Sequence, residues 1–341
     1  MRRMNHLVAI ALLCSPLALS GCLSKNGWFD LKLPEHSIVS IESVAVSPDG
    51  NDIAAGTSGG RVWVWDTVAD EIRFNPRVGK YTVTALAYSP DGAWLAAGTV
   101  TDCVRLLDAR TGELLKVFSS FEGTPIAIRF SADGARLNVV LNGGTLYTFD
   151  TADRELLASC RFSDERLCGA CFSPDGKRVA WRSYANEVGV TDVESGEVVW
   201  RVPVDPCLTF KPPAWLTTTT LGACTQLMGV TQLDARTGKT NAQFIPEFPP
   251  LRFPDDVEPV PGTKLVVLYG WGGAELWDIE QEQRVHEFPL ENSIIASARI
   301  LPGGEQLVTA DWDGRLVIWR LEDGARIREM TNAAGAMARR R

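Results

Sequence analysis

The sequence predicts an all-β fold in which one structural unit is repeated seven times. The first observation is the tetrapeptide Ser47-Pro48-Asp49-Gly50, which recurs, once with Ala for Pro, at residues 89–92, 131–134 and 173–176, each time 42 residues further on. The second is a residue pair with the same spacing, beginning with Trp65-Asp66. The third is a content of 30 Gly and 11 Trp, which suits a turn-rich β protein better than a helical one. A fixed period of this size indicates a repeat architecture.

The residue pair defines the seven units, which together span residues 38–330. Its copies follow one another at intervals of 42 residues, with a single interval of 44. They are Trp65-Asp66, Leu107-Asp108, Phe149-Asp150, Thr191-Asp192, Leu233-Asp234, Trp277-Asp278 and Trp319-Arg320.

Each unit is predicted to contain four antiparallel strands. In the first unit an alternating apolar strand is followed by a turn at Pro48-Asp49-Gly50, a second strand, a turn at Gly59-Gly60 and a third strand, RVWVWD. Turns of this kind join antiparallel strands. The fourth strand is evident in later units, at residues 113–118 and 197–202.

Four strands in about 42 residues, with Trp-Asp or a related pair closing the third strand, resemble the blade of a WD-repeat β-propeller. The resemblance covers residues 38–330 and implies a seven-bladed propeller with four antiparallel strands per blade. The chain departs from the family because the Gly-His pair that opens many repeats is missing, and only His36 lies near such a place. The sixth unit begins inside a Pro-rich run, residues 246–261, which we expect to be a loop or an edge over the propeller.

A propeller must close its ring, and the sequence offers two outer strands for the last blade. Residues 28–33 have a suitable pattern, and so do residues 325–330. The pattern does not choose between them. Closure by the N-terminal segment would hold the propeller close to Cys22, which the next features of the sequence predict to be a lipid anchor.

The first 21 residues are predicted to form a cleaved secretory signal. A basic head at Arg2 and Arg3 precedes an apolar run of 13 residues, which at ~1.5 Å per residue is too short to span a hydrocarbon core of ~30 Å. The run ends in Leu19-Ser20-Gly21-Cys22, which resembles the lipobox of bacterial lipoproteins. The resemblance implies palmitate-type acyl chains on Cys22, and two or more such chains hold a protein stably at a membrane. The alternative is an ordinary secretory signal with a chance cysteine.

This interpretation divides the remaining chain into three parts. Residues 22–37 are the lipidated N terminus and tether, residues 38–330 the propeller, and residues 331–341 a basic C-terminal tail. Leu23, rather than Asp, follows the cysteine, which is similar to lipoproteins sorted to the outer membrane. We therefore expect an envelope protein on the periplasmic side of the outer membrane rather than at the inner membrane.

The net charge of the chain argues against two classes of ligand. Without residues 1–21 the chain has 320 residues, with 32 Lys plus Arg (34 less Arg2 and Arg3) and 42 Asp plus Glu, a formal charge of −10. Nucleic acid and anionic lipid reward basic surfaces, so we expect neither as the main ligand.

The sequence shows no catalytic constellation. After the signal it has two histidines, His36 and His286, in different units, and no His/Cys/Asp cluster at metal-ligand spacing. We therefore expect no enzyme, no metal and no cofactor. The alternative is a hydrolase of the lactonase-like propeller type, which would need carboxylates or a metal converging on the centre.

Six cysteines follow the lipobox, and an exported chain meets an oxidising compartment. Aligning the fifth unit by its strands places Cys207 opposite Cys224 in one hairpin, which makes this pair the first disulfide candidate. Cys160 with Cys168 is the second. Cys168-Gly-Ala-Cys171 has the spacing of a redox motif, but it lies on a predicted strand, where residues three apart point to opposite faces. We expect structural roles for both residues.

In the WD-repeat family the loops between second and third strands, and those between blades, form the usual ligand platform. Here these loops carry Tyr184, Tyr269, Trp271 and Trp312. Large aromatic side chains in turns are typical of interface anchors; the alternative is that they pack over blade edges. We expect a non-catalytic scaffold that binds another protein of the bacterial envelope. A further alternative is an accessory subunit of an outer-membrane assembly complex, by functional analogy with a propeller lipoprotein of eight blades and a different repeat type.

Overall fold

The computed structural model describes residues 39–100, 103–119, 121–204, 211–224, 230–244 and 253–331. They lie within one unit of the chain, Ile38–Arg341. Every element in these ranges is a β-strand, and within each sheet the strands pair antiparallel in chain order, which confirms the predicted all-β class. The N-terminal segment with Cys22 lies outside the described residues.

Six sheets are formed by the described strands. Five have four strands each: β1 (Ile41–Val46), β2 (Asp52–Thr57), β3 (Val62–Asp66) and β4 (Glu71–Phe74); β5 (Val83–Tyr88), β6 (Trp94–Thr99), β7 (Cys103–Asp108) and β8 (Leu114–Phe118); β9 (Pro125–Phe130), β10 (Arg136–Leu141), β11 (Thr145–Asp150) and β12 (Leu156–Arg161); β13 (Leu167–Phe172), β14 (Arg178–Ser183), β15 (Glu187–Asp192) and β16 (Val198–Pro203); β17 (Ala214–Trp215), β18 (Thr220–Cys224), β19 (Val230–Asp234) and β20 (Thr240–Phe244). The remaining sheet has six strands: β21 (Phe253–Pro259), β22 (Leu265–Asp278), β23 (Gln283–Ile300), β24 (Gln306–Asp311), β25 (Arg315–Arg320) and β26 (Arg326–Thr331).

The six-stranded sheet covers the stretch in which the sixth and seventh units were predicted. Strand β22 pairs with β21 through Val266–Trp271 and with β23 through Gly273–Asp278. Strand β23 likewise pairs with β22 up to Ile294 and with β24 from Ile295 onward. The four-strand pattern predicts a turn between the second and third strands of the sixth unit and a loop between the sixth and seventh units. Both places are instead parts of continuous strands, β22 and β23, which is why the two units appear as one sheet.

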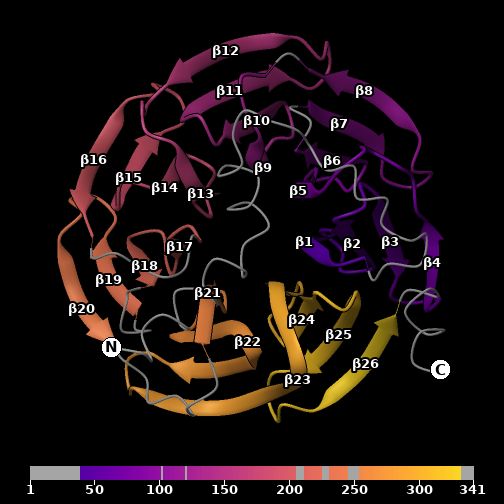
Figure 1. The fold of residues 1–341 in the computed structure, drawn as a ribbon, viewed down its shortest axis with the longest axis vertical. Helices are drawn as coiled ribbons and strands as arrows, with labels where there is room; N and C mark the ends of the chain where they lie inside the picture. The colour runs from indigo at the N-terminus through magenta and orange to yellow at the C-terminus, as the bar shows by residue number, and fades with distance from the viewer. Residues whose placement is uncertain are drawn as a thin grey trace, which may run out of the picture. The chain divides into compact units, whose positions relative to one another are not determined.

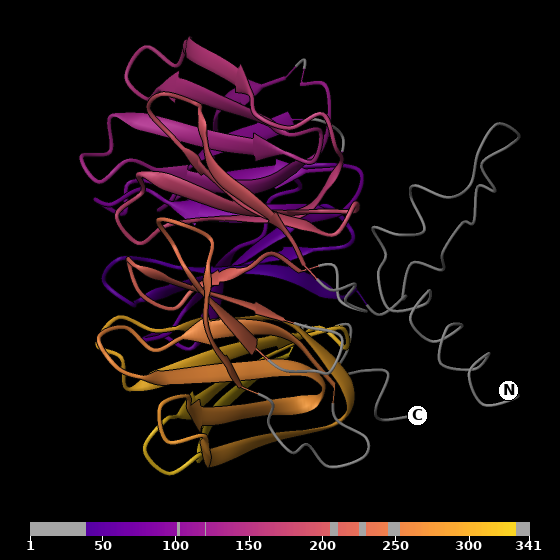
Figure 2. The same cartoon turned by 90° about the vertical axis from the view of Figure 1, so that its left-hand side faces the viewer.

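The sheets are arranged around a common centre (Figure 1). Strands β1, β5, β9 and β13 lie nearest to that centre, and β4, β8, β12 and β16 lie on the outside. The view turned by 90° shows neighbouring sheets packed against one another along the unit (Figure 2). Because each sheet can bury both faces between its neighbours, strands of the core are buried on both sides, as in β2, where all six residues are buried.

The first and last sheets pack on each other, so the ring closes. Ile41 and Trp63 of the first sheet share one buried cluster with Leu316, Ile318 and Met330 of the last. In addition, Arg328 on β26 donates to the carbonyl of Thr67 at 2.5 Å and lies 3.4 Å from the Asp70 carboxylate. The outer strand of the last sheet is β26, from the C-terminal end of the chain. The C-terminal segment therefore supplies the outer strand of the last sheet, while residues 28–33 lie outside the described residues.

The repeated Ser-Pro-Asp-Gly motif forms the turn between the first and second strands. Ser47 Oγ donates to Asp49 Oδ1 at 2.6 Å and accepts from Asp52 N at 2.8 Å, while Gly50 takes a φ of 76°, which favours glycine. The same Ser-to-Asp bond recurs at 2.5–2.6 Å in the copies at residues 89–91, 131–133 and 173–175. The motif recurs because each copy closes the same turn.

The Asp of the second repeated marker closes the turn between the third and fourth strands. Asp108 Oδ1 accepts from the backbone N–H groups of Arg110 and Thr111 at 3.0 and 2.8 Å. The Thr111 N–H, above all, lowers the pKa of Asp108. At Asp66 the N–H of Ala69 and then the Arg73 guanidinium lower the pKa to about 2.

We expect the thermal midpoint to fall as the pH is lowered from ~4 to ~2. A carboxylate whose pKa is lower in the folded state stabilises that state above its unfolded pKa of ~3.9, and the contribution is lost as the pH falls through the folded value, about 2 for Asp66. Thermal unfolding between pH 7 and pH 2 measures this loss. Asp108→Asn should lower the midpoint at neutral pH, and this difference should vanish at the acid end. A difference that persists there would contradict the explanation.

Candidate functional site

In the first and fourth sheets, the loop between the second and third strands contacts a segment that connects neighbouring sheets. In the first sheet Ser58 N donates to Ser40 O at 2.9 Å, and Gly60 O accepts from Val78 N at 2.8 Å. In the fourth sheet Tyr184 N donates to Arg166 O at 3.0 Å. We call the surface formed by residues 58–61, 75–82, 163–166, 184–186, 271–272 and 312–314 the loop face.

Two of the four predicted aromatic residues are well exposed on the loop face. The side chains of Tyr184 and Trp271 have 38% and 44% of their surface exposed. The Arg166 guanidinium lies over the Tyr184 ring, 5.9 Å from its centroid. Trp312 is half-buried, and its backbone N–H donates to Ile294 O at 3.1 Å. Tyr184 and Trp271 therefore have the accessibility that an interface anchor needs.

The prediction for Tyr269 needs correction, because this residue is only 2% exposed. It lies within the β21–β22 ladder, opposite Asp256, and its hydroxyl donates to Asp256 Oδ2 at 2.8 Å. Burial and the Asp256 carboxylate hold the pKa of Tyr269 well above its ordinary value. Tyr269 is thus a core residue with a satisfied hydroxyl, as the packing alternative expected.

Tyr269 belongs to a charged cluster that the sequence analysis missed. Lys211 Nζ lies 3.9 Å from Asp256 Oδ2 and donates to Ala296 O at 3.0 Å. On the same strand as Asp256, Glu258 accepts from Ile300 N at 3.2 Å and lies 3.4 Å from Arg299. The cluster unites residues up to 88 positions apart in sequence, from Lys211 to Arg299, so no local motif could have indicated it.

A group of cations on the loop face was also missed. Arg61, Arg77 and Lys80 are exposed, and Tyr81 beside them has 45% of its surface exposed. Lys80 Nζ lies 5.2 Å from the centroid of the Tyr81 ring. The signal was available, because residues 77–81 lie in a segment between two predicted blades, and such segments were assigned to the platform.

The candidate disulfides remain predictions. Cys207 lies outside the described residues, as does the lipidation residue Cys22, while Cys224 ends β18. The Cys160 thiol donates to Gly196 O at 3.1 Å, and the Cys168 thiol to Arg182 O at 3.3 Å. In this structure the two thiols contact different carbonyl groups.

Cys171 is expected to react slowly with thiol reagents in the native protein. Its thiol donates to Pro213 O at 2.7 Å, and burial raises its pKa above the ordinary value, so little thiolate forms at neutral pH. Alkylation followed by peptide mass spectrometry should label Cys171 at least ~10-fold faster after unfolding. Rapid labelling of the native protein, or a native Cys168–Cys171 disulfide, would show that the pair is a redox site after all.

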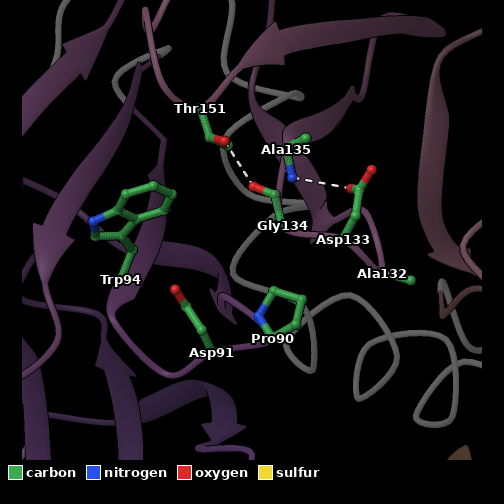
Figure 3. Close-up of a pocket in the computed structure, with 8 residues that line it drawn as sticks. All are labelled: Pro90, Asp91, Trp94, Ala132, Asp133, Gly134, Ala135 and Thr151. Carbon is green, nitrogen blue, oxygen red and sulfur yellow. Dashed lines mark hydrogen bonds between the residues drawn. The ribbon is translucent and has the colours of Figure 1, made fainter.

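The opposite end of the second and third sheets has a shallow depression between two Ser-Pro/Ala-Asp-Gly turns (Figure 3). Its polar groups are used by the turns themselves: Asp133 Oδ1 accepts from Ala135 N at 3.0 Å, and Thr151 Oγ1 donates to Gly134 O at 2.7 Å. Asp91 makes the equivalent bond to Ala93, and Trp94 borders the depression. These bonds give the depression a structural explanation.

Within the described ranges, no three His, Cys, Asp or Glu side chains are grouped so that they could hold a metal ion. The same part of the chain has no helix long and apolar enough to cross a membrane.

Comparison with protein families gives a match over most of the chain. The family described as outer membrane protein assembly factor BamB matches residues 100–330. The chain belongs to this family. Two WD-type families match the N-terminal part, namely the anaphase-promoting complex subunit 4 WD40 domain over residues 53–133 and the WD domain, G-beta repeat, over residues 29–66. The relation to outer-membrane assembly propellers, expected above only as functional analogy, is therefore a relation of sequence.

A solved structure agrees on the fold. The protein described as "Structure of U3-55K" superposes with a TM-score of 0.68 at 14% sequence identity, covering 80% of this chain and 88% of that chain. At this identity the likeness concerns the propeller fold alone. No curated protein matches the chain.

Proposed function

We propose that the protein is a lipid-anchored, seven-bladed propeller that binds another protein of the bacterial envelope and serves the assembly of outer-membrane proteins. The observation that carries the proposal is the family match over residues 100–330, whose description names an assembly factor. WD-type matches in the remaining part support the same general role, because propellers of this kind present rigid platforms to protein partners.

Seven blades follow if the six-stranded sheet comprises two units. Its long strands serve two ladders each, with Trp277-Asp278 and Trp319-Arg320 closing the third strand of one unit and of the next. The period of 42 residues supports this division, although the strands are continuous.

The binding site in this proposal is the loop face around Tyr184 and Trp271. Both side chains are substantially exposed, although large aromatic side chains are usually buried, and such residues dominate the energy of protein interfaces. A backbone hydrogen bond to Arg166 holds Tyr184, and strand pairing on both sides holds Trp271, which lowers the entropy lost on binding.

The hydrolase alternative required carboxylates converging on the centre. Asp256 and Glu258 do lie together on β21, one of the inner strands (Figure 1), but Tyr269, Lys211 and Arg299 already engage them. Carboxylates paired in this way support the structure of the six-stranded sheet, and the scaffold proposal is therefore preferred.

The anchor is tested with Cys22→Ser in the full-length chain. We expect the wild-type protein in the membrane fraction with an acylated N-terminal peptide, detected by mass spectrometry, and the variant in the soluble periplasmic fraction. An unmodified Cys22 in the mature wild-type protein would contradict the anchor without touching the scaffold role.

The assembly role is tested by deleting the gene in the native host and measuring the amount of folded β-barrel proteins in the outer membrane. We expect a decrease that the wild-type protein restores and a Tyr184→Ala/Trp271→Ala variant does not. The matched control replaces two exposed apolar residues of outer strands, Leu114→Ala/Leu156→Ala, and should restore the barrels fully. Unchanged barrel levels in the deletion strain would overturn the role.

A further inference from the structure

We propose that Arg61, Arg77, Lys80 and Tyr81 form a second membrane contact, which binds the anionic phospholipid headgroups of the membrane that holds the anchor. We call these four residues the basic patch. The inference deepens the proposed function and rests on its lipid anchor, because the anchor brings the propeller to a lipid surface. It assigns the loop face of the first sheet an orientation toward the membrane.

The basic patch is held rigidly by the backbone. Arg61 and Arg77 face each other across an isolated antiparallel bridge, Val62 N donates to Pro76 O at 3.1 Å, and Val78 is 1% exposed. The guanidinium groups are also positioned, because Arg61 donates to Asn75 O at 2.9 Å and Arg77 to Gly79 O at 3.1 Å. A preorganised patch loses little side-chain entropy when it binds.

Within the part of the chain that the structure describes, no carboxylate neutralises the charges of the patch. Among the described residues no carboxylate lies within ion-pair distance of Arg61, Arg77 or Lys80, whose recorded contacts are with backbone carbonyls and the Tyr81 ring. Arg73, only four positions before Arg77, shows the contrast, since it pairs with Asp52 at 2.7 Å and with Asp66 at 2.6 Å. Three cations without a carboxylate partner among the described residues, on a chain of net charge −8, favour an anionic ligand at this place.

Tyr81 adds the aromatic component of an interfacial site. Its ring is 45% exposed and carries Lys80 Nζ 5.2 Å from its centroid. Tyrosine is favoured at the level of lipid headgroups, because its ring is apolar and its hydroxyl stays in water. Lysine and arginine beside it meet the phosphates, each contributing about fivefold to the binding of an anionic surface.

The position of the patch favours lipid over an acidic protein segment. The described chain begins at Val39, which lies against Gly59, while Ser40 O accepts from Ser58 N at 2.9 Å. The chain thus joins the propeller on the loop face of the sheet that carries the patch. From Cys22 to Val39 there are 17 residues, which reach at most ~60 Å at ~3.5 Å per residue. A surface tethered at this distance is presented to the patch at high effective concentration.

The test uses the mature full chain with Cys22→Ser, so that acyl chains do not contribute, and vesicles of phosphatidylcholine alone or mixed equally with phosphatidylglycerol. We expect binding to the mixed vesicles only, and a loss on the order of 100-fold in the vesicle partition coefficient for Arg61→Gln/Arg77→Gln/Lys80→Gln. The matched control, Arg136→Gln/Lys177→Gln/Lys239→Gln, removes three exposed cations from the turns at the opposite end and should bind as before. Equal thermal midpoints show that all variants are folded.

Three results would overturn the proposal. The first is that the protein with an unmodified patch does not bind the mixed vesicles. The second is that the two triple variants lose vesicle binding equally. The third is that a poly-glutamate peptide binds more tightly than the vesicles, which would assign the patch to an acidic protein partner. The anchor is tested independently, by measuring whether Cys22 of the wild-type protein is acylated. Failure of the patch and failure of the anchor are therefore distinguishable.

Discussion

Replacing Trp181 with Ala is expected to lower the free energy of unfolding by about 3–5 kcal/mol. Trp181 on β14 is 1% exposed and fills the space above Gly189 on the neighbouring strand, where an added Cβ would come within 2.2 Å of the indole. Its Nε1 donates to Thr191 Oγ1 at 3.0 Å, and this bond is lost as well. Denaturant unfolding followed by circular dichroism measures the change.

Two variants separate the causes of this loss. Thr191→Val removes only the hydrogen bond of Trp181 and should cost ~1–2 kcal/mol, whereas Gly189→Ala forces the indole out of its place and should cost more. In the last sheet Trp319 on β25 donates to Thr309 on β24 at 2.9 Å, so a Trp–Thr bond between the corresponding two strands recurs with the two residues exchanged. A Trp181→Ala protein within ~1 kcal/mol of the wild type would contradict the packing described here.

Deleting residues 326–341 is expected to abolish cooperative folding, whereas deleting residues 23–37 leaves the thermal midpoint within a few degrees. The first deletion removes β26, with it the buried Met330 from the cluster shared by the first and last sheets, and the contacts of Arg328 with Thr67 and Asp70. It also leaves β25 as an unpaired edge on which chains can aggregate.

Solubility, circular dichroism and thermal unfolding of the two deletion proteins give the answer. The deletions have similar lengths, so each is the control for the other. A stable protein without residues 326–341, together with an unfolded one without residues 23–37, would show that the N-terminal segment closes the ring, contrary to the structure.

The repeating part of the fold was predictable because its signals are local. A Ser-x-Asp-Gly turn needs only the Ser47 hydroxyl, the Asp49 carboxylate and the left-handed conformation of Gly50, and these lie within four residues. The continuity of β22 and β23 was not predictable, because it depends on pairing between Trp271 and Ile294, which are distant in sequence.

The candidate site was predictable only in part, for a similar reason. Tyr269 and Trp271 are two positions apart on β22 and would be expected to share a face. Tyr269, however, lies within the ladder opposite Asp256, whereas Trp271 lies where the ladder ends and the register shifts, so only Trp271 is exposed. Depth within the sheet, rather than alternation along the strand, decides the exposure of these two residues.

The most direct test of the scaffold proposal is photo-crosslinking in living cells of the native host. A photoreactive phenylalanine analogue replaces Tyr184 or Trp271 on the loop face, and Leu114 or Leu156 on the outer strands as controls. We predict that both loop-face positions yield one crosslinked protein of the outer-membrane assembly machinery, identified by mass spectrometry, and that the outer-strand positions do not. Crosslinks to that protein only from the outer strands, or none from any position, would contradict the assignment of the loop face as the partner-binding surface.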